Sequence, residues 1–283
     1  MKRAHVAYQG VPGAYSSIAA RKAFPKLPAR GYPTFEEVVA AAKRGSAAYA
    51  LLPIENSTAG RVADIHHLLP GSKLHVVGEY FLPVRHCLVG LRGAKWKDIA
   101  RVYSHREALS QCARYIRGLG AEPVPFGDTA GAVEHVVAAG SKSNAAIASA
   151  EAAALHTGST ILARNIQDSA DNVTRFLIVT GKRPRRAPKE RVITSVVYKV
   201  RDIPAALFKS LSGFATAGVN IIKLESFVPM ARHADAHFYI EFEGNPSVYP
   251  ASVAMEELGY YARELEILGT YAKSPYRRTF NGQ

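Results

Sequence analysis

The sequence predicts an α/β protein that is followed by a smaller unit in which strands and helices are arranged as βαββαβ. Up to about residue 180, short apolar segments alternate with helical patterns, which is typical of sheets with mainly parallel strands. A charged segment broken by Pro184 and Pro188 then separates this region from the second one. With 283 residues, the chain has room for two domains.

The elements of the first region follow from apolar runs bounded by turn and capping residues. Thr34, with Glu37 three residues later, forms a capping box at one helix start, and Ser104 is predicted to cap another. Strands are predicted over residues 5–9, 47–52, 74–91, 100–103, 122–125, 145–148, 160–163 and 176–180. Helices are predicted over residues 16–24, 35–44, 107–118, 128–139 and 150–156. Ligands of such sheets bind in the loops beyond the carboxyl ends of the strands.

The second region has the order of a ferredoxin-like unit. Asp202 and Pro204 suit a helix start, Leu207, Leu211 and Phe214 share an apolar face, and Gly218 suits the helix end. Strands are predicted over residues 194–200, 219–227, 237–242 and 266–271, and a second helix over residues 248–265. This order alone says nothing about activity.

The net charge of +13 raises the question of nucleic-acid binding. Most of the excess lies in the linker over residues 181–191 and in the tail after residue 271, where solvated charge is expected, and no nucleic-acid motif accompanies it. No apolar run is long enough to span a membrane, and the first residues lack the features of a secretory signal. Cys87 and Cys112 lack metal or disulfide spacing. We therefore expect a cytoplasmic protein that binds neither nucleic acid nor membranes.

Five polar clusters stand where a strand gives way to a loop or helix. A glycine turn at residues 9–16 opens a helix and can hold an anion on free backbone N–H groups. Residues 52–60 form a polar loop after an apolar strand, and residues 104–112 begin a helix. Residues 128–132 are expected to cap a helix. The cluster at residues 171–176 places amide, hydroxyl and guanidinium groups before a buried strand. Its Arg175 suits either a bound carboxylate or a buried pair with a structural Asp.

Taken in order, these clusters resemble the prephenate dehydratase family. The family's motifs are matched by Gly10-Val-Pro-Gly-Ala-Tyr-Ser16, Pro53-Ile-Glu-Asn-Ser57, Ser104-His105, Gln111-Cys112 and Asn172-Val-Thr-Arg-Phe176. The resemblance covers essentially the whole chain. It implies a two-lobed catalytic domain like a periplasmic binding protein, with the site in the cleft between the lobes, followed by an ACT regulatory domain. The domains are expected at residues 1–181 and 192–272, with a basic tail at residues 273–283.

The resemblance also assigns the site residues. It makes Thr174 the catalytic hydroxyl, with Arg175, Asn172, Glu55, Asn56, Ser104 and Gln111 around it. Substrate-binding positions are expected at Gly13, Ala14, Tyr15, Ser57, Thr129 and Phe176. Prephenate loses carbon dioxide and hydroxide, and a hydrogen bond from Thr174 would help hydroxide leave. Arg175 is expected to hold the pyruvyl carboxylate, because binding the departing carboxylate would oppose its loss. Aromatisation drives the reaction, so neither a metal nor an organic cofactor is expected.

The predicted regulatory unit departs from the family pattern. Ala205-Ala206-Leu207 stands where the family has Gly-Ala-Leu, and Phe227-Val228 replaces Arg-Pro after Glu225-Ser226. Phenylalanine is the expected effector, bound across an ACT dimer, and a homodimer or homotetramer is expected. Its site is predicted at Ala205, Ala206, Leu207, Asn220, Leu224, Glu225 and Ser226.

Two alternatives remain open at this stage. Arogenate dehydratase would share fold and motifs while acting on the transaminated substrate. A non-catalytic amino-acid sensor could combine a two-lobed binding domain with an ACT domain, although a sensor does not need the hydroxyl of Thr174.

Overall fold

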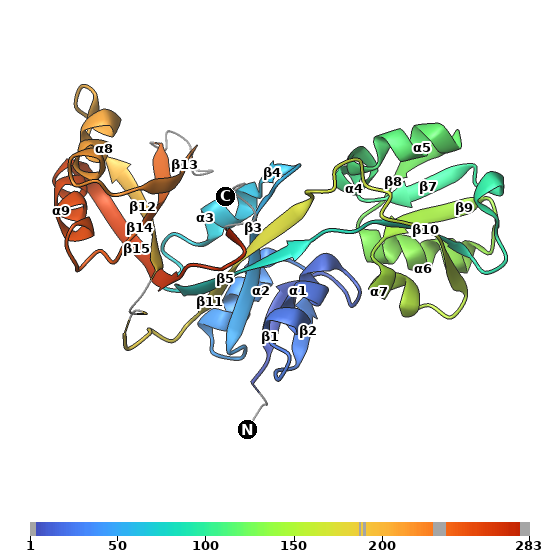
Figure 1. The fold of residues 1–283 in the computed structure, drawn as a ribbon. Helices are drawn as coiled ribbons and strands as arrows, with labels where there is room; N and C mark the ends of the chain where they lie inside the picture. Colours follow the sequence, from blue (N-terminus) through green and yellow to red (C-terminus); the bar gives the residue numbers. More distant parts are fainter. Residues whose placement is uncertain (1–3, 187, 189–190, 229–235, 278–283) are drawn as a thin grey trace. The chain divides into compact units, whose positions relative to one another are not determined.

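The computed structural model describes residues 4–186, 188, 191–228 and 236–277 (Figure 1). The chain forms two compact units. The first comprises Met1–Val38, Leu51–Val62 and Phe81–Phe176, and the second comprises Val39–Ala50, Ala63–Tyr80 and Leu177–Gln283. The predicted linker residues 187, 189 and 190 and the tail residues 278–283 lie outside the described residues. The predicted domain boundaries stay predictions.

The first sheet has the strand order β2-β1-β3-β11-β5, with β4 paired to β3. Its strands are β1 (Val6–Gln9), β2 (Ala29–Tyr32), β3 (Tyr49–Asn56), β4 (Gly60–Arg61), β5 (His75–Pro83) and β11 (Val173–Thr180). The helices that alternate with them are α1 (Tyr15–Ala23), α2 (Phe35–Lys43) and α3 (Ala63–Leu68). β1 and β2 are parallel, as predicted for an α/β region. The backbone N–H of Glu37 donates to Thr34 Oγ1 over 3.3 Å, which confirms the cap of α2.

The second sheet, with order β10-β6-β9-β7-β8, lies wholly within the first unit. Its strands are β6 (Cys87–Leu91), β7 (Arg101–Ser104), β8 (Glu122–Pro125), β9 (Asn144–Ala148) and β10 (Ser159–Arg164). Between them stand the 3₁₀ turn Trp96–Asp98, α4 (Arg106–Gln111), α5 (Ala113–Leu119), α6 (Thr129–Ala139) and α7 (Ala150–Ala154). The side chain of Asp128 accepts hydrogen bonds from Ala130 N and Gly131 N, so the predicted cap of α6 is confirmed.

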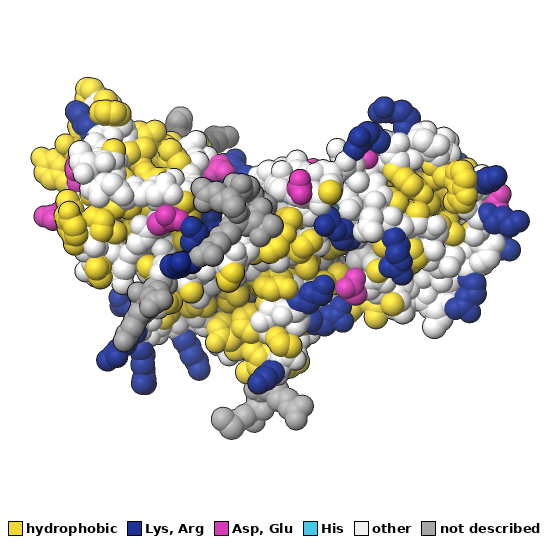
Figure 2. Space-filling model, viewed as in Figure 1, with side chains coloured by type: hydrophobic (Ala, Val, Ile, Leu, Met, Phe, Trp, Pro, Cys, Tyr) yellow, Lys and Arg dark blue, Asp and Glu magenta, His cyan; other side chains and the backbone are white. Residues whose placement is uncertain are grey.

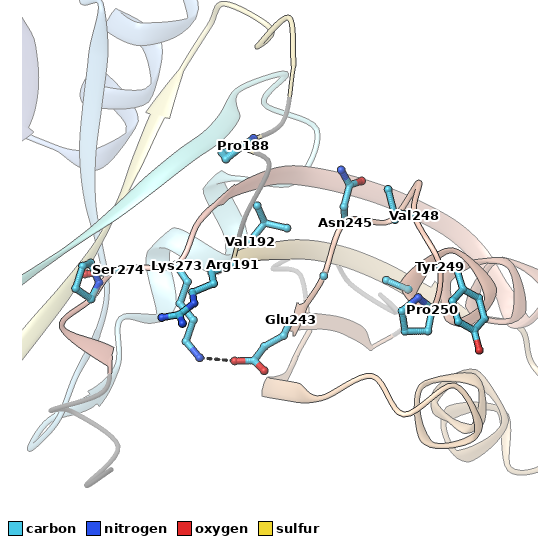
Figure 3. Close-up of a pocket in the computed structure, with 13 residues that line it drawn as sticks. Pro188, Arg191, Val192, Glu243, Asn245, Val248, Tyr249, Pro250, Lys273 and Ser274 are labelled. Carbon is cyan, nitrogen blue, oxygen red and sulfur yellow. Dashed lines mark hydrogen bonds and ion pairs between the residues drawn. The ribbon is translucent and has the colours of Figure 1, made fainter.

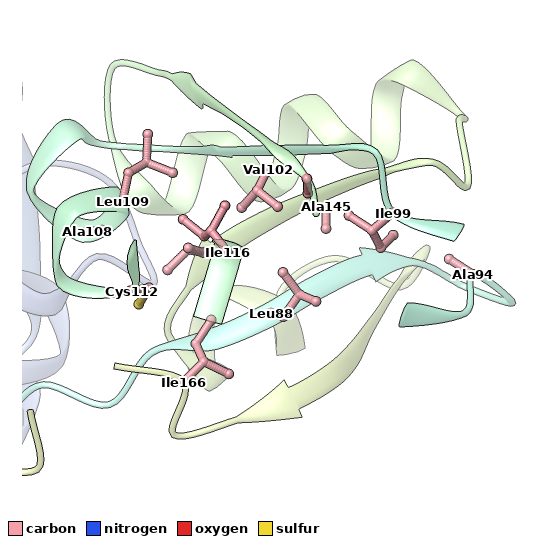
Figure 4. Packing of buried hydrophobic residues seen from close by; sticks show 12 residues of the cluster. Leu88, Ala94, Ile99, Val102, Ala108, Leu109, Cys112, Ile116, Ala145 and Ile166 are labelled. Atoms are coloured by element: carbon pink, nitrogen blue, oxygen red, sulfur yellow. The ribbon is translucent and has the colours of Figure 1, made fainter. Parts of the chain in front are cut away.

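Both faces of the second sheet are covered by helices, and successive strand residues point to opposite faces. On one face, Leu88 of β6 packs with Leu109 of α4 and Ile116 of α5 (Figure 4). On the other face, Val89 of β6 packs with Val133 of α6. These two apolar clusters fix the sheet between its helices.

The third sheet lies in the second unit and has the order β13-β14-β12-β15. Its elements are β12 (Val192–Val200), α8 (Ala206–Thr216), β13 (Ile221–Phe227), β14 (His237–Glu243), α9 (Ala251–Tyr261) and β15 (Ala262–Ala272). Every strand pair is antiparallel, and α8 and α9 pack on the core of Phe214, Ile240 and Leu258. Two α/β sheets followed by a βαββαβ unit are the fold class that the sequence predicts, and this prediction is confirmed.

Several predicted elements were wrong in extent. The single strand predicted over residues 74–91 is two strands, β5 and β6, which belong to different sheets. The helix predicted over residues 107–118 is broken at Cys112, whose backbone (φ −122°, ψ 20°) lies outside the helical region. The helix predicted to residue 265 ends at Tyr261, because β15 already begins at Ala262. The predicted alternation also missed β2.

A buried ion cluster in the second unit joins three segments far apart in sequence. Arg277 Nε and Nη2 each donate to a carboxylate oxygen of Glu79 on β5 over 2.8 Å, and Nη2 also donates to Glu241 on β14 over 3.1 Å. The side chains of both glutamates are 0 % exposed, and that of Arg277 is 7 % exposed. The expectation that charges in the tail are solvated is therefore wrong for Arg277. We call Glu79, Glu241 and Arg277 the ion cluster.

The remaining surface is mixed in character. Figure 2 shows Lys and Arg side chains spread over the face in view, and hydrophobic side chains gathered over α8 and α9. Among the latter, Phe208 on α8 is 75 % exposed and Tyr260 on α9 is 66 % exposed. In the described part of the chain, no helix combines the length and apolar character needed to cross a membrane.

Candidate active site

The predicted polar loop after β3 lies directly against the start of β11. Ser57 N donates to Val173 O over 2.9 Å, and Val173 N donates to Ser57 Oγ over 2.9 Å. The hydroxyl of Ser57 in turn donates to Asp171 O over 2.5 Å. These bonds pin the two sequence clusters together, although they lie more than a hundred residues apart. Ser57, predicted as a substrate-binding residue, here uses its hydroxyl to hold the loop.

Asn56 is the centre of the hydrogen-bond network that results. Its Oδ1 accepts from the backbone N–H groups of Thr58 and Ala59 over 3.0 and 2.8 Å. Its Nδ2 donates to Asn172 Oδ1 over 2.8 Å and to Thr174 Oγ1 over 3.0 Å. Since backbone N–H groups can only donate, they fix which end of the amide is oxygen, and the orientation of Asn56 follows from them.

Thr174 is half-buried at the start of β11. Because its oxygen accepts the hydrogen bond from Asn56, its own hydrogen remains free to be donated. Within the described part of the chain, that hydrogen has no acceptor. A hydroxyl whose oxygen already accepts a bond is also a better donor, because hydrogen bonds in a chain polarise one another.

Gln111 closes the network from the end of α4. Its Oε1 accepts from Asn172 Nδ2 over 2.8 Å, and its Nε2 donates to Thr58 Oγ1 over 2.9 Å. Asn172 itself is buried, with 1 % of its surface exposed. The structure thus brings together four predicted catalytic residues: Asn56, Gln111, Asn172 and Thr174.

Arg175 has a different place from the one expected for a substrate-binding group. Its side chain is 1 % exposed, its Nη1 donates to Glu55 Oε1 over 3.0 Å, and its guanidinium lies 6.0 Å from the centre of the Phe81 ring. A guanidinium without exposed surface cannot meet a substrate carboxylate in this arrangement, so the expected contact is corrected. The alternative, a buried arginine paired with an acid, describes the geometry, with Glu55 as the acid.

Ser104 also departs from its prediction. It is fully buried, and its hydroxyl donates to Ile147 O over 2.6 Å, whereas the cap of α4 is His105. The capping role predicted for Ser104 is therefore wrong, because its side chain points into the sheet rather than along the helix. None of its hydrogen bonds joins the network around Asn56.

The remaining predicted substrate positions differ in accessibility. Phe176 is 1 % exposed and belongs to the core. Gly13 is buried against α7, and Thr129 is the first residue of α6.

The start of α1 has free backbone donors. Ala14 is the N-cap residue of α1 without a side-chain cap, so backbone N–H groups at this helix start are left for another acceptor. Tyr15 directs its hydroxyl to Arg85 O and His86 Nδ1, each over 2.9 Å.

Sequence reasoning missed two members of the network. Thr58 lies in the polar loop at residues 52–60, and its hydroxyl donates to Asn56 Oδ1 over 2.7 Å. His86 lies between β5 and β6 and contacts Gln111 Oε1 over 2.9 Å. The available signal was a polar Arg85-His86 pair between two apolar runs, which also marks the break between the two strands.

The cysteines near the network are not poised for nucleophilic attack. Burial raises the pKa of the Cys112 thiol far above its ordinary value, and the carboxylate of Asp168 adds to this rise. Burial also raises the pKa of Cys87. Both thiols therefore stay protonated at neutral pH. Among the residues that the structure describes, no group of three or more His, Cys, Asp and Glu side chains could hold a metal ion.

Comparison with known proteins identifies the family of the chain. Residues 6–184 match the family model of prephenate dehydratase. The chain belongs to the prephenate dehydratase family. It is 43 % identical to a bifunctional N-acyl-homoserine lactone acylase/prephenate dehydratase of Komagataeibacter europaeus, over 96 % of this chain and 97 % of that protein. It is 38 % identical to arogenate dehydratase/prephenate dehydratase 2 of Arabidopsis thaliana, over 95 % of this chain and 73 % of that protein.

A solved prephenate dehydratase has a similar fold. The crystal structure of the enzyme from Arthrobacter aurescens in complex with L-Phe aligns with a TM-score of 0.86 and 27 % identity, over 96 % of this chain and 94 % of that one. The fold similarity therefore includes the third sheet as well as the two α/β sheets.

The residues predicted to bind phenylalanine fall at two ends of the third sheet. Phe227 of β13 and Lys199 of β12 both pair with His237, so β13 and β12 end at the same edge of the sheet. Leu224, Glu225 and Ser226 of β13 approach this edge. The chain also enters α8 from it, at Ala205, Ala206 and Leu207. Asn220 O instead accepts from Glu243 N at the opposite end. Because α8 has 11 residues and spans about 16 Å, a single chain does not bring Asn220 to Ala205.

A cavity of about 1070 Å³ opens at the Asn245 end of the same sheet (Figure 3). Lys273 lines it and is paired with Glu243, and this hydrogen bond holds the pKa of the Glu243 carboxyl below its ordinary value. Tyr249, Pro250 and Val248 form an apolar wall. The cavity is thus separate from the predicted position at Ala205.

Proposed function

We propose that this protein is a prephenate dehydratase, which converts prephenate to phenylpyruvate, carbon dioxide and water. The family match supports the reaction class. The observation that carries the proposal is the hydroxyl of Thr174, which accepts a hydrogen bond from Asn56 and keeps its own hydrogen for another acceptor. A lyase that expels hydroxide needs such a donor in a defined position.

In the proposed reaction, the bond between ring C1 and its carboxylate breaks, and its electron pair enters the ring. The bond between C4 and its hydroxyl breaks at the same stage, and the departing hydroxide takes up a proton to form water. Thr174 donates a hydrogen bond to that oxygen. A threonine hydroxyl is a very weak acid, so the proton itself comes from solvent, and Thr174 stabilises the charge that develops.

The roles of the neighbours follow from their contacts. Asn56, oriented by two backbone N–H groups, directs the Thr174 hydroxyl, while Asn172 and Gln111 hold Asn56. We assign Arg175 to positioning Glu55, and we assign a substrate carboxylate to the uncapped start of α1 near Ala14. A separate carboxylate site of this kind leaves the departing carboxylate unclamped.

The first experiment compares prephenate and arogenate as substrates of the purified protein. We expect phenylpyruvate from prephenate and a higher kcat/KM for prephenate than for arogenate. A higher kcat/KM for arogenate would assign the chain to arogenate dehydratase, the alternative supported by the Arabidopsis relative. Turnover of neither substrate would support the amino-acid sensor.

For regulation, we propose that the third sheet and its helices form an ACT domain, that phenylalanine is its ligand, and that the chain forms a homodimer or homotetramer. Support comes from the L-Phe complex of the Arthrobacter enzyme and from the exposed apolar side chains of α8 and α9. A second chain could also supply the Asn220 that one chain keeps away from Ala205. Calorimetric titration with phenylalanine and light scattering of the purified protein test these two statements. We further propose a cytoplasmic location, to be checked by fractionation.

A second candidate activity comes from the relative of Komagataeibacter europaeus, whose name includes N-acyl-homoserine lactone acylase and which is 43 % identical to this chain. We propose testing this hydrolysis directly, with release of the free fatty acid as the signal. The buried, protonated Cys112 is unsuited to act as its nucleophile. If wild-type protein releases no fatty acid, this second activity is ruled out and the dehydratase proposal is unaffected.

A further inference from the structure

His86 holds a position that the dehydratase mechanism above does not use. It lies between β5 and β6, is 2 % exposed, and has both ring nitrogens in hydrogen bonds. Its Nδ1 lies 2.9 Å from the Tyr15 hydroxyl, and its Nε2 lies 2.9 Å from Gln111 Oε1. A buried histidine with two fixed partners has one hydrogen to place when it is neutral, so its tautomer can be worked out.

The starting point is the backbone. Thr58 N and Ala59 N fix Oδ1 of Asn56 as an acceptor, so Nδ2 of Asn56 faces Asn172. Oδ1 of Asn172 accepts that hydrogen bond over 2.8 Å, so Nδ2 of Asn172 faces Gln111. The atom of Gln111 that it meets, over 2.8 Å, must therefore be the oxygen Oε1.

The same reasoning reaches the imidazole. Because Gln111 Oε1 can only accept, Nε2 of His86 must donate to it. In a neutral ring Nδ1 then carries no hydrogen, and the Tyr15 hydroxyl shares its single hydrogen between this nitrogen and Arg85 O, each over 2.9 Å. Burial lowers the pKa of His86 and so favours the neutral form. Tyr15 and Gln111 are the polar side chains that contact the ring nitrogens.

We propose that His86 is a positioning residue of the dehydratase reaction, acting through Gln111 on the network that directs the Thr174 hydroxyl. Two donors, His86 Nε2 and Asn172 Nδ2, converge on Gln111 Oε1 and fix the amide plane. Gln111 Nε2 is thereby held against Thr58, which donates to Asn56. This inference rests on the proposed function, and it adds a residue of β5–β6 to a site otherwise built from β3, α4 and β11.

The kinetic test uses one variant that removes the donor and one that keeps it. His86→Leu should lower kcat about 10- to 100-fold, because small displacements of a reacting group have effects of this size, with a smaller change in KM. His86→Gln places an amide N–H near the former Nε2 and should restore most of the lost kcat. Normal turnover by His86→Leu, or equal loss in both variants, overturns the proposal.

A double variant tests whether the effect passes through Gln111. If it does, His86→Leu should reduce kcat no further in a protein that already carries Gln111→Ala. Multiplication of the two losses would instead mean that His86 acts by another route and would overturn the proposal. Circular dichroism and thermal melting of each variant identify any loss of fold.

A spectroscopic test needs neither substrate nor substitution. In ¹⁵N-labelled wild-type protein, long-range ¹H–¹⁵N correlation should show the His86 hydrogen on Nε2 and a bare Nδ1, and this decides the matter even where His86→Leu does not fold. A hydrogen on Nδ1 overturns the role of His86 alone. Absence of prephenate turnover by wild-type protein overturns the proposed function and the kinetic role together, so the two failures are distinguishable.

Discussion

The network around Thr174 and the ion cluster of the second unit solve the burial of polar groups in opposite ways. The network consists of neutral amides and hydroxyls, and it ends at the half-buried Thr174, whose hydroxyl hydrogen is available for donation. The ion cluster places two carboxylates at 0 % side-chain exposure around one guanidinium, with further bonds from Tyr239 and Tyr271 to Glu241.

We relate the ion cluster to stability and the network around Thr174 to reactivity. The hydrogen bonds that join Glu79, Glu241 and Arg277 lie inside the fold, where charges must be paired to be tolerated. The amide network needs no counter-charge, so it can present one unused donor without an uncompensated ion. The proposed site of chemistry is thus the amide network, which leaves the hydroxyl hydrogen of Thr174 available for donation. The following changes test this contrast, beginning with the largest expected effect.

Replacement of Thr174 by valine should lower kcat about 10²- to 10³-fold, the range typical of losing one hydrogen-bond donor to a developing negative charge, while the melting temperature changes little. Valine keeps the branched shape and removes only the hydroxyl. Thr174→Ser, which retains the hydroxyl, is the matched control and should keep much of the activity. Near-normal kcat in Thr174→Val, measured as phenylpyruvate formation, would remove Thr174 from the reaction.

Replacement of Arg277 by alanine should lower the free energy of unfolding by about 3–5 kcal/mol, because it leaves two buried carboxylates without their cation. Denaturant unfolding measures this change. The exposed Arg186→Ala is the control and should shift the free energy of unfolding by less than about 0.5 kcal/mol. Equal effects of the two substitutions would mean that the ion cluster contributes little.

Gly13 gives an intermediate effect in the loop that opens α1. A Cβ there would come within 2.8 Å of Ala152 Cα, and the backbone has φ +87°, so Gly13→Ala should destabilise the fold by about 1–3 kcal/mol. Gly118→Ala in α5, where nothing lies within 4 Å, is the control and should be neutral or slightly stabilising. A neutral Gly13→Ala would show that the loop moves away from α7 without cost.

The smallest effect concerns pH. Burial lowers the pKa of His86 below 6.5 in the folded state, so the unfolded chain binds the proton first as the pH falls. Neutral His86 therefore contributes fully to the free energy of unfolding above pH 6.5, and this contribution is lost as the pH falls through the pKa that His86 has in the folded state. The stability of wild-type protein should therefore decline more between neutral and acid pH than that of His86→Gln. Parallel curves from pH-dependent unfolding would contradict the assignment.

The sequence predicted what depends on local pattern. Alternating apolar runs gave the two α/β sheets and the βαββαβ unit, and ordered motifs gave Asn56, Gln111, Asn172 and Thr174. The motifs lie on different elements, so their hydrogen bonds could not be read from spacing. Arg175 illustrates this limit: its residue type suits a carboxylate, but only the fold shows that the carboxylate belongs to Glu55.

Tertiary context decided the remainder. Residues 74–91 were predicted as one strand, yet the chain changes sheets at Arg85-His86, and this polar pair is a weak local sign beside the apolar residues that flank it. His86 was missed for the same reason, since a lone histidine carries no motif. Arg277 looked like a solvated tail charge because its two partners, Glu79 and Glu241, are remote in sequence.

The ion cluster also has a consequence for the order of folding during synthesis. Arg277 leaves the ribosome 198 residues after Glu79, so both buried carboxylates wait for their cation until the strands that carry them have long been made. The second unit, whose segments are separated along the chain by parts of the first, can therefore reach its final packing only after Arg277 has been synthesised. A nascent chain stalled before Arg277 should be readily cut by protease in β14, even though all the strands of its sheet have been synthesised.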